Sequence, residues 1–207
     1  VKTAETSDDA DQALRFDHTV PLARYVVEHQ NDLAFPFRVS QFGRNFRGER
    51  AQKGRFREFY QMDADIIGRN TLPIGYDAEV VATAFHALSQ FVRTPILVRL
   101  SNRKILAGLL EALALTEKSS EIYGIIDHAE KVPTEVTETK IREQVADESK
   151  VQTLLQFVQI RGPRAEVAEK LTALGIENET FATGVNELLL ILDLLEAQGI
   201  GQSVIAD

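Results

Sequence analysis

The pattern of apolar residues changes near residue 105, and this change constrains the fold more than any other feature of the 207-residue sequence. Before that point, short runs rich in Phe, Val and Arg favour β-strands and alternate with two helical patterns. After it, nearly every stretch combines Leu, Ala, Glu and Lys at helical spacing. We therefore predict an α+β protein of two domains, residues 1–105 and residues 106–207, the second all helical.

Each domain is predicted to contain a defined set of elements. In the first, we expect a helix at residues 19–30 with Thr19 as its N-cap, and a second helix from Asp77 to a point before Pro95. Strands are expected at 37–48, 55–67 and 96–100, the first two forming an antiparallel hairpin with a mobile polar loop. In the second domain, helices are expected at 102–115, 119–131, 137–146, 148–159, 164–174 and 185–198, with Gly175 and Gly199 as stops.

Charge is distributed unevenly along this chain, whose net charge is −8. Residues 1–105 carry 15 Lys and Arg against 13 Asp and Glu, whereas residues 106–207 carry 8 against 18. Within residues 38–57, seven cationic side chains accompany a single acid, Glu49. Such a concentration of positive charge predicts an anion bound to this segment.

Several kinds of site are not expected in this sequence. The chain has no cysteine, which excludes disulfides, thiolate metal sites and cysteine nucleophiles. No apolar run approaches the roughly 20 residues that span a bilayer, so we expect a cytoplasmic protein without membrane partners. No histidine and carboxylate have zinc-helix spacing and no glycine-rich phosphate loop is present, so no protein-held metal is expected. We expect His18 to be structural, because no serine or cysteine nucleophile motif accompanies it.

Alternation along the second predicted strand separates two kinds of side chain. One face carries Arg55, Arg57, Phe59, Gln61, Asp63 and Asp65. The other carries Phe56, Tyr60, Met62, Ala64 and Ile66, with Glu58 as the exception, and is expected to be core. The first face would suit a nucleotide, since arginines bind phosphates, an aromatic ring stacks on a base, and amide and carboxylate groups take a polar cation. The alternative is a charged sheet face that is merely solvated.

Three segments of the first domain, in order, resemble the histidyl-tRNA synthetases, a family of class II aminoacyl-tRNA ligases. Residues 46–50 (FRGER) and 54–61 (GRFREFYQ), followed by two aspartates, resemble the family's motif 2. Residues 14–24 (LRFDHTVPLAR) resemble its L-R-P-[DE]-x-T segment, and residues 101–106 (SNRKIL) its N-x-R-K-I-L block. Phe16 and Ala51 stand where the family usually has proline. The likeness is strong over residues 10–110 and weak over the helical remainder, and it implies a partial class II antiparallel sheet with flanking helices, followed by a helical insertion domain.

The resemblance implies an ATP site on the predicted hairpin. Arg47 would hold the α-phosphate and Arg55 would reach the outer phosphates, which makes these two the catalytic candidates. Glu49 would lie near the adenine amino group, and Phe59 would stack on the adenine. Magnesium would arrive with ATP as part of the substrate.

The same resemblance implies a site for histidine. Asp17 and Thr19 would take its α-amino group, Gln61 would approach its carboxylate, and Asp65 its imidazole. A carboxylate suits an ammonium or an imidazole N–H, so the chemistry of each assignment is consistent.

The implied reaction needs no protein nucleophile. The carboxylate of histidine attacks the α-phosphorus of ATP, pyrophosphate leaves with magnesium, and the 3′ end of histidine tRNA then takes the histidyl group. The full-length protein would be a homodimer. The helical domain would contact the tRNA acceptor stem. Because this domain is acidic overall, we expect a local basic patch to make the contact, with Arg161 and Arg164 as the candidates.

The family's motif 1 is expected before residue 1 and its glycine-rich motif 3 after Asp207. We therefore expect a piece of a longer synthetase that carries half an active site and is inactive alone. An alternative is the non-catalytic regulatory subunit of ATP phosphoribosyltransferase, which keeps this fold, and a third is a regulatory domain in a larger sensor. The presence of Asp17, Thr19, Gln61 and Asp65 favours the enzyme.

Overall fold

The computed structural model describes residues 13–50 and 52–207, which cluster into two compact units that divide between Tyr76 and Asp77. Ala51, one of the two departures from the family pattern, lies outside the described residues. The first unit holds helix α1 (Thr19–His29) and strands β1 (Phe37–Phe46) and β2 (Glu58–Ile67). Helix α2 (Gly75–Ser89) and all later elements cluster in the second unit, apart from the first two residues of α2.

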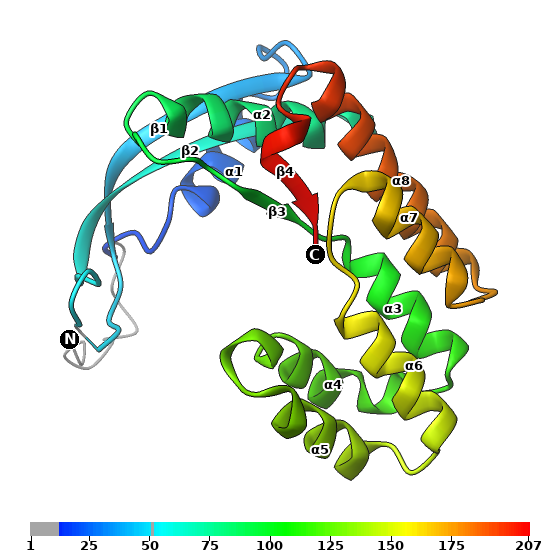
Figure 1. The fold of residues 1–207 in the computed structure, drawn as a ribbon. Coiled ribbons are helices and arrows are strands. Elements are labelled where there is room, and N and C mark those ends of the chain that lie inside the picture. The colour runs from blue at the N-terminus through cyan, green and yellow to red at the C-terminus, as the bar shows by residue number, and fades with distance from the viewer. Residues whose placement is uncertain (1–12, 51) are drawn as a thin grey trace. The chain divides into compact units, whose positions relative to one another are not determined.

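The division at Tyr76 lies well before residue 105, because α2 packs with the helices that follow it. Ala78 and Ala82 of α2 are buried in the same hydrophobic cluster as the later helices. The functional division into residues 1–105 and 106–207 stays a prediction. The α+β mixture of one antiparallel hairpin and many helices is as predicted (Figure 1).

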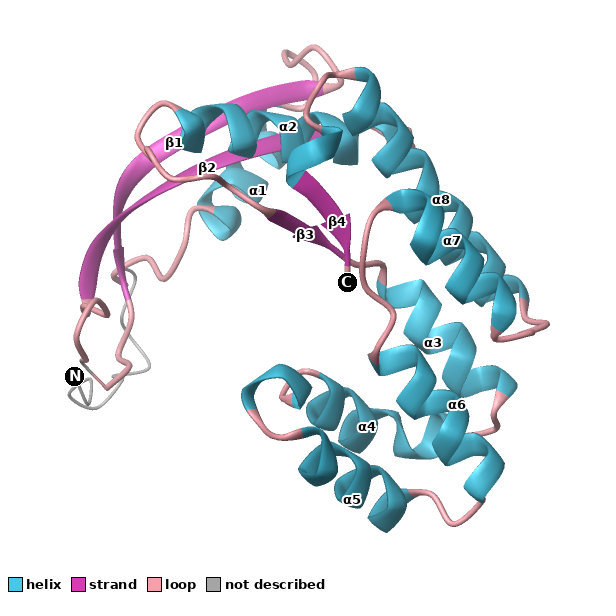
Figure 2. Cartoon of the chain, in the orientation of Figure 1, coloured by secondary structure: helices cyan, strands magenta, loops and turns pink. Residues whose placement is uncertain are grey.

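Strands β1 and β2 form a long antiparallel hairpin, with Phe37 opposite Ile67 and Phe46 opposite Glu58 (Figure 2). Its tip contains a tight turn in which the N–H groups of Gln52 and Arg55 donate to each other's carbonyl oxygens, at 3.1 and 2.9 Å. Gly54 has φ +78° in this turn, a conformation that glycine adopts without steric cost. The predicted hairpin is confirmed, with strands slightly shorter than expected.

The expectation that the apolar face of the hairpin is core is wrong for the described chain. Phe42 of β1, Tyr60 and Met62 are 71%, 58% and 67% exposed. Phe42 and Tyr60 stack on each other with ring centroids 5.1 Å apart. Arg44 donates to the Tyr60 hydroxyl at 3.1 Å and forms an ion pair with Glu58, which accounts for an acid on this face.

The polar face is the one that is half buried, because the segment before α1 lies against it. Gly43 of β1 is opposite Gln61, and a Cβ at Gly43 would stand 2.4 Å from Arg15 Nη2 and 3.1 Å from His18 Cε1. The missing side chain therefore admits this segment. His18 is 3% exposed, and its Nε2 lies 3.3 Å from the backbone oxygen of Gln61, a bond that requires the proton on Nε2.

Helix α1 begins at Thr19, but Thr19 is not its cap as predicted. The Asp17 carboxylate takes that role, because its Oδ1 accepts from the backbone N–H groups of Thr19 (3.1 Å) and Val20 (3.3 Å). Amide groups in the first turn of a helix have no partner within the helix, so a carboxylate just before it stabilises its start.

The second unit is mostly helical, as expected. Its helices after α2 are α3 (Arg103–Ala112), α4 (Ser119–Ile126), α5 (Thr134–Gln144), α6 (Glu148–Val158), α7 (Arg164–Ala173) and α8 (Glu179–Ala197), with short turns η1 (Thr116–Lys118), η2 (Ala129–Lys131) and η3 (Gly201–Ser203). Helix α8 begins before the predicted residue 185, because Asn178 Oδ1 caps it by accepting from Phe181 N at 2.9 Å. Gly175 and Gly199 follow α7 and α8 with φ of +64° and +80°, which confirms them as helix stops.

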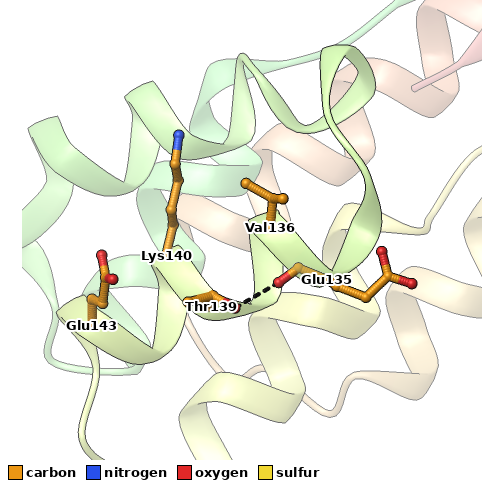
Figure 3. Close-up of a pocket in the computed structure, with 5 residues that line it drawn as sticks. All are labelled: Glu135, Val136, Thr139, Lys140 and Glu143. Atoms are coloured by element: carbon orange, nitrogen blue, oxygen red, sulfur yellow. Dashed lines mark hydrogen bonds between the residues drawn. The ribbon is translucent and has the colours of Figure 1, made fainter.

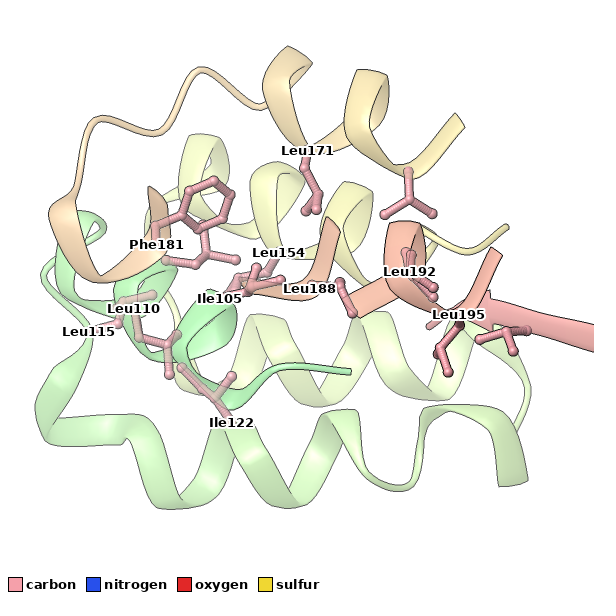
Figure 4. Close-up of a cluster of buried hydrophobic side chains, with 14 of the residues drawn as sticks. Ile105, Leu110, Leu115, Ile122, Leu154, Leu171, Phe181, Leu188, Leu192 and Leu195 are labelled. Carbon is pink, nitrogen blue, oxygen red and sulfur yellow. The ribbon is translucent and has the colours of Figure 1, made fainter. Parts of the chain in front are cut away.

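One hydrophobic core joins these helices, and leucine and isoleucine side chains from α3, α4, α6, α7 and α8 fill it (Figure 4). Helices α3 and α8 approach each other at two glycines. A Cβ at Gly108 would lie 2.2 Å from Phe181 N, and one at Gly184 would lie 2.7 Å from Ile105 N. The N-x-R-K-I-L block starts α3 with Asn102 as N-cap, whose side chain accepts from Lys104 N at 2.9 Å.

A short strand, β4 (Val204–Ala206), was not predicted. It pairs in parallel with β3 (Val98–Leu100), and Asp207 N donates to Leu100 O at 2.8 Å (Figure 1). The chain therefore leaves β3, forms six helices and returns beside its point of departure. A segment whose two ends lie side by side can be inserted into a domain without disturbing the strands on either side of it.

Candidate active site

The half-buried face of the hairpin brings together three of the predicted site residues. Arg47 follows β1, and its Nη2 donates to Gln61 Oε1 of β2 at 3.4 Å. The guanidinium carbon of Arg47 also lies 5.1 Å from the centroid of the Phe59 ring, within the range of a cation–π contact. A cation, an aromatic ring and an amide are thus contiguous on one surface.

The segment that precedes α1 reaches the same group. The Phe16 ring centroid lies 4.6 Å from the guanidinium carbon of Arg47, and Arg47 Nε donates to Phe16 O at 3.4 Å. The Arg47 guanidinium thus lies near two rings, those of Phe16 and Phe59. Asp17, the next residue, uses Oδ1 to cap α1, and Thr19 is exposed at the first turn.

Gln61 lies in a short relay of side chains on the same face. Asn45 Nδ2 donates to Gln61 Oε1 at 2.9 Å, and Gln61 Nε2 donates to Asp63 Oδ1 at 2.7 Å. Asp65 is farther along β2, where its Oδ2 accepts from Gln41 Nε2 at 3.5 Å. Asp65 therefore shares the strand face of Gln61 but makes a separate contact.

The two remaining predicted residues lie at the hairpin tip. Arg55 and Glu49 form an ion pair, and Glu49 O accepts from Arg57 Nε at 3.3 Å. The Arg55 side chain is 59% exposed, and an exposed ion pair contributes only about 0–1 kcal/mol. Arg55 is thus bonded within the loop rather than beside Arg47, in a contact weak enough for a phosphate to replace.

Asn45, Phe16 and Gln41 were not identified from the sequence as contributors to this face. Asn45 is fully buried, and it is opposite Phe59 in the hairpin register. The signal that could have found Asn45 and Gln41 is the alternation of β1, whose positions 41, 43 and 45 share a face with Gln61 once the strands are paired.

Elsewhere in the described chain, few features suggest chemistry. Residues 13–50 and 52–207 contain no group of three or more His, Asp or Glu side chains that could hold a metal ion. Over the same ranges, no helix is long and apolar enough to cross a membrane.

One surface hollow lies along a single helix, α5, and is lined by Glu135, Val136, Thr139, Lys140 and Glu143 (Figure 3). The Thr139 hydroxyl donates to Glu135 O at 2.7 Å, within the helix itself, so the hollow offers no convergent set of groups.

The two arginines expected to contact RNA are both paired with carboxylates. Arg161 forms ion pairs with Glu130 and Asp207, and Arg164 Nη2 donates to Asp193 Oδ2 at 2.9 Å. Each positive charge is therefore balanced locally. The contact with RNA expected of Arg161 and Arg164 stays a prediction.

Comparison with known proteins identifies relatives along almost the whole chain. A family model described as histidyl-tRNA synthetase matches residues 3–207. The histidine--tRNA ligase of Finegoldia magna is 42% identical over 91% of this chain and 44% of its own length. That of Stenotrophomonas maltophilia is 40% identical over 97% of this chain and 45% of its own length. The chain thus spans just under half the length of these curated relatives.

Solved structures have the same fold. The crystal structure of histidyl-tRNA synthetase from Nostoc sp. PCC 7120 aligns with a TM-score of 0.84 at 33% identity, over 94% of this chain and 45% of that one. A structure titled as an ATP phosphoribosyltransferase regulatory subunit/histidyl-tRNA synthetase, from Bacillus halodurans C, aligns with a TM-score of 0.78 at 24% identity, over 93% of this chain and 48% of that one. The predicted fold class is confirmed.

Proposed function

This chain belongs to the histidyl-tRNA synthetase family, and we propose that it supplies part of the site where such a ligase activates histidine with ATP and passes it to histidine tRNA. The observation that carries the proposal is the contact between Arg47 Nη2 and Gln61 Oε1 at 3.4 Å. The family resemblance assigns Arg47 to the α-phosphate and Gln61 to the carboxylate of histidine. Adenylate formation joins these two groups, so the residues that bind them must be neighbours.

The arrangement around Arg47 fits an ATP site. A guanidinium binds phosphate oxygens through a planar fork of N–H groups, and its charge opposes the negative charge that builds on the phosphoryl oxygens. The Phe59 ring, whose centroid lies 5.1 Å from the guanidinium carbon of Arg47, offers a flat apolar surface for adenine. Arg55 would exchange its contact with Glu49 for the outer phosphates, which frees Glu49 to accept from the adenine amino group. ATP would enter as its magnesium complex.

Histidine would lie along the polar face of β2. Asp17 has one carboxylate oxygen on the helix cap, and its second oxygen would accept from the α-ammonium together with the Thr19 hydroxyl. Gln61 would donate to the carboxylate, and Asp65 would accept from the imidazole. Asp65 Oδ2 accepts from Gln41 Nε2 at 3.5 Å. Because the Gln41 amide is neutral, this contact does not balance the negative charge of Asp65, which can then pair with a ligand.

The chemistry is positional. An oxygen of the histidine carboxylate bonds to the α-phosphorus as the bond to the bridging oxygen breaks, and magnesium pyrophosphate leaves. The terminal hydroxyl of tRNA then attacks the adenylate carbonyl and AMP departs. No protein atom forms a covalent bond, so the residues act by orientation and charge. In this proposal the enzyme is a cytoplasmic homodimer whose helical segment approaches the tRNA.

The regulatory subunit of ATP phosphoribosyltransferase is the competing function. The support for it is a neighbour whose title names both functions and whose 24% identity speaks only for the fold. A regulatory protein has no need of an arginine at the α-phosphate beside an amide at the carboxylate. The presence of Arg47 and Gln61 in contact favours the ligase.

The test is histidine-dependent exchange of pyrophosphate into ATP, measured with the protein at its natural length. We expect Arg47→Ala to lower the exchange rate by about 10²–10³-fold, the range seen when one donor to a developing negative charge is removed. Arg24→Ala is the matched control, because Arg24 lies on exposed α1 and pairs only with Glu28 among the contacts described. It removes the same charge and should exchange at the wild-type rate.

Two results would contradict the proposal. Wild-type protein that exchanges no pyrophosphate with histidine present would favour the regulatory function. Equal exchange by Arg47→Ala and Arg24→Ala would remove Arg47 from the site.

A further inference from the structure

Asn45 is the one fully buried polar side chain of the described hairpin strands. It is 0% exposed and lies opposite Phe59, on the face that carries Gln61. Its Nδ2 donates to Gln61 Oε1 at 2.9 Å. No described group donates to its Oδ1, which is buried. The sequence resemblance assigns no role to Asn45.

The orientation of the two amides follows from their fixed neighbours. A guanidinium can only donate and an ionised carboxylate can only accept. Arg47 therefore requires an acceptor from Gln61, and Asp63 requires a donor, which places Oε1 toward Arg47 and Nε2 toward Asp63. Asn45 must then present Nδ2 to Oε1. Turning the Asn45 amide over would bring two oxygens together, so its Oδ1 is left without a donor.

This arrangement fixes what Gln61 can offer a ligand. An amide has two acceptor and two donor positions. Asn45 and Arg47 fill both acceptor positions and Asp63 takes one N–H, so a single N–H of Gln61 is left. That group can bind only an acceptor, such as a carboxylate oxygen.

Asn45 holds Gln61 more closely than Arg47 does, at 2.9 Å against 3.4 Å. In the ATP complex proposed above, Arg47 would turn its N–H groups to a phosphate, and Asn45 would then be the main donor to Gln61 Oε1. A buried acceptor without a partner is unfavourable for folding, so Asn45 is a residue that stability alone would not select.

We propose that Asn45 is a positioning residue, which holds the Gln61 amide so that its remaining N–H points at the carboxylate of histidine. This inference rests on the proposed function and extends it to a residue outside the three family motifs. Asn45 itself contacts no substrate.

The test compares Asn45→Leu with wild type at natural length, in pyrophosphate exchange and in thermal unfolding. Leucine has the branched shape of asparagine without its donor. We expect a rise in KM for histidine of roughly threefold to tenfold, the effect of losing one hydrogen bond, and little change in KM for ATP. Tm should not fall, because the unpartnered Oδ1 is removed with the donor.

Thr137→Val is the matched control. Thr137 of α5 is 2% exposed, and its Oγ1 is likewise buried without a described partner. Valine should leave Tm and both KM values at or near wild type. If Asn45→Leu does not fold, Asn45→Ala removes the same donor without adding bulk, and the same rise in KM for histidine is expected.

An unchanged KM for histidine in a folded Asn45 variant would overturn the inference while leaving the proposed function intact. A fall in Tm with equal rises in both KM values would show a structural role and would also overturn it. Absence of histidine-dependent exchange in the wild type would instead overturn the proposed function, and this inference with it.

Discussion

In the proposed site, specificity for the amino acid depends on Asp65. We expect Asp65→Asn, at natural length, to raise KM for histidine by about 10-fold or more while KM for ATP stays within about twofold, since a charged acceptor for the imidazole becomes a neutral amide. The contact with Gln41 can survive, because the asparagine oxygen can still accept from Gln41 Nε2. Steady-state exchange at varied histidine and varied ATP measures both constants, and equal changes in the two would show that Asp65 is structural.

Individual residues were predictable where strand alternation and a known motif agree. Phe59 and Gln61 were placed on one face of a hairpin with Arg47 near them, and the structure brings the three into contact. The partners that orient them were not predictable. Asn45 lies on β1, so its contact with Gln61 depends on how β1 and β2 are paired. Phe16 reaches Arg47 only because the segment before α1 folds over the hairpin.

At the scale of elements, the packing of α3 against α8 makes a sharp prediction. Alanine at Gly184 would place its Cβ 2.7 Å from Ile105 N, a backbone atom that cannot turn aside. We expect Gly184→Ala to lower the free energy of unfolding by about 1–3 kcal/mol through overpacking. Gly124→Ala in α4 is the control, because nothing lies within 4 Å of its would-be Cβ, and alanine there should stabilise by up to about 1 kcal/mol. Urea unfolding followed by circular dichroism measures the free energy of unfolding of both variants. Equal changes in the two would contradict the close packing of α3 against α8 at Gly184.

Helices of the second unit were predictable from apolar spacing and glycine stops, whereas two features of the strands were not. Strand β4 is short, and its partner β3 is separated from it in the sequence by helices α3 to α8. No local sequence pattern therefore predicts that the two strands pair. The buried face of the hairpin was assigned to its apolar residues, but Gly43 admits Arg15 and His18 to the polar face instead. Hydropathy shows which face could be buried, and the position of a neighbouring segment decides which face is.

Across the whole molecule, ion pairs predict how stability depends on pH. A hydrogen bond from Arg99, aided by the charge of Arg161, lowers the pKa of Glu130, and hydrogen bonds from Lys104 and then Asn102 lower that of Glu187. A carboxyl whose pKa is lower in the folded state stabilises the fold above its unfolded pKa, and this contribution is lost as pH falls through the folded value.

We therefore expect the urea midpoint to fall as pH is lowered below about 4.5, with a shallower fall in the double variant Glu130→Gln, Glu187→Gln. The contribution of Glu130 should shrink in high salt, because its side chain is exposed, whereas the half-buried Glu187 is screened less. A midpoint that rises in acid, or the same slope in the double variant, would contradict the ion-pair assignment.

We propose that the polar face of the β1–β2 hairpin, together with residues 15–19, binds the adenylate that forms from histidine and ATP. A crystal structure of the natural-length protein with a non-hydrolysable histidyl-adenylate analogue tests it most directly. We expect a phosphoryl oxygen within hydrogen-bonding distance of Arg47 and the adjacent acyl oxygen within hydrogen-bonding distance of the Gln61 N–H, with adenine against Phe59. An analogue bound elsewhere, with Arg47 and Gln61 still bonded only to each other and their present neighbours, would contradict it.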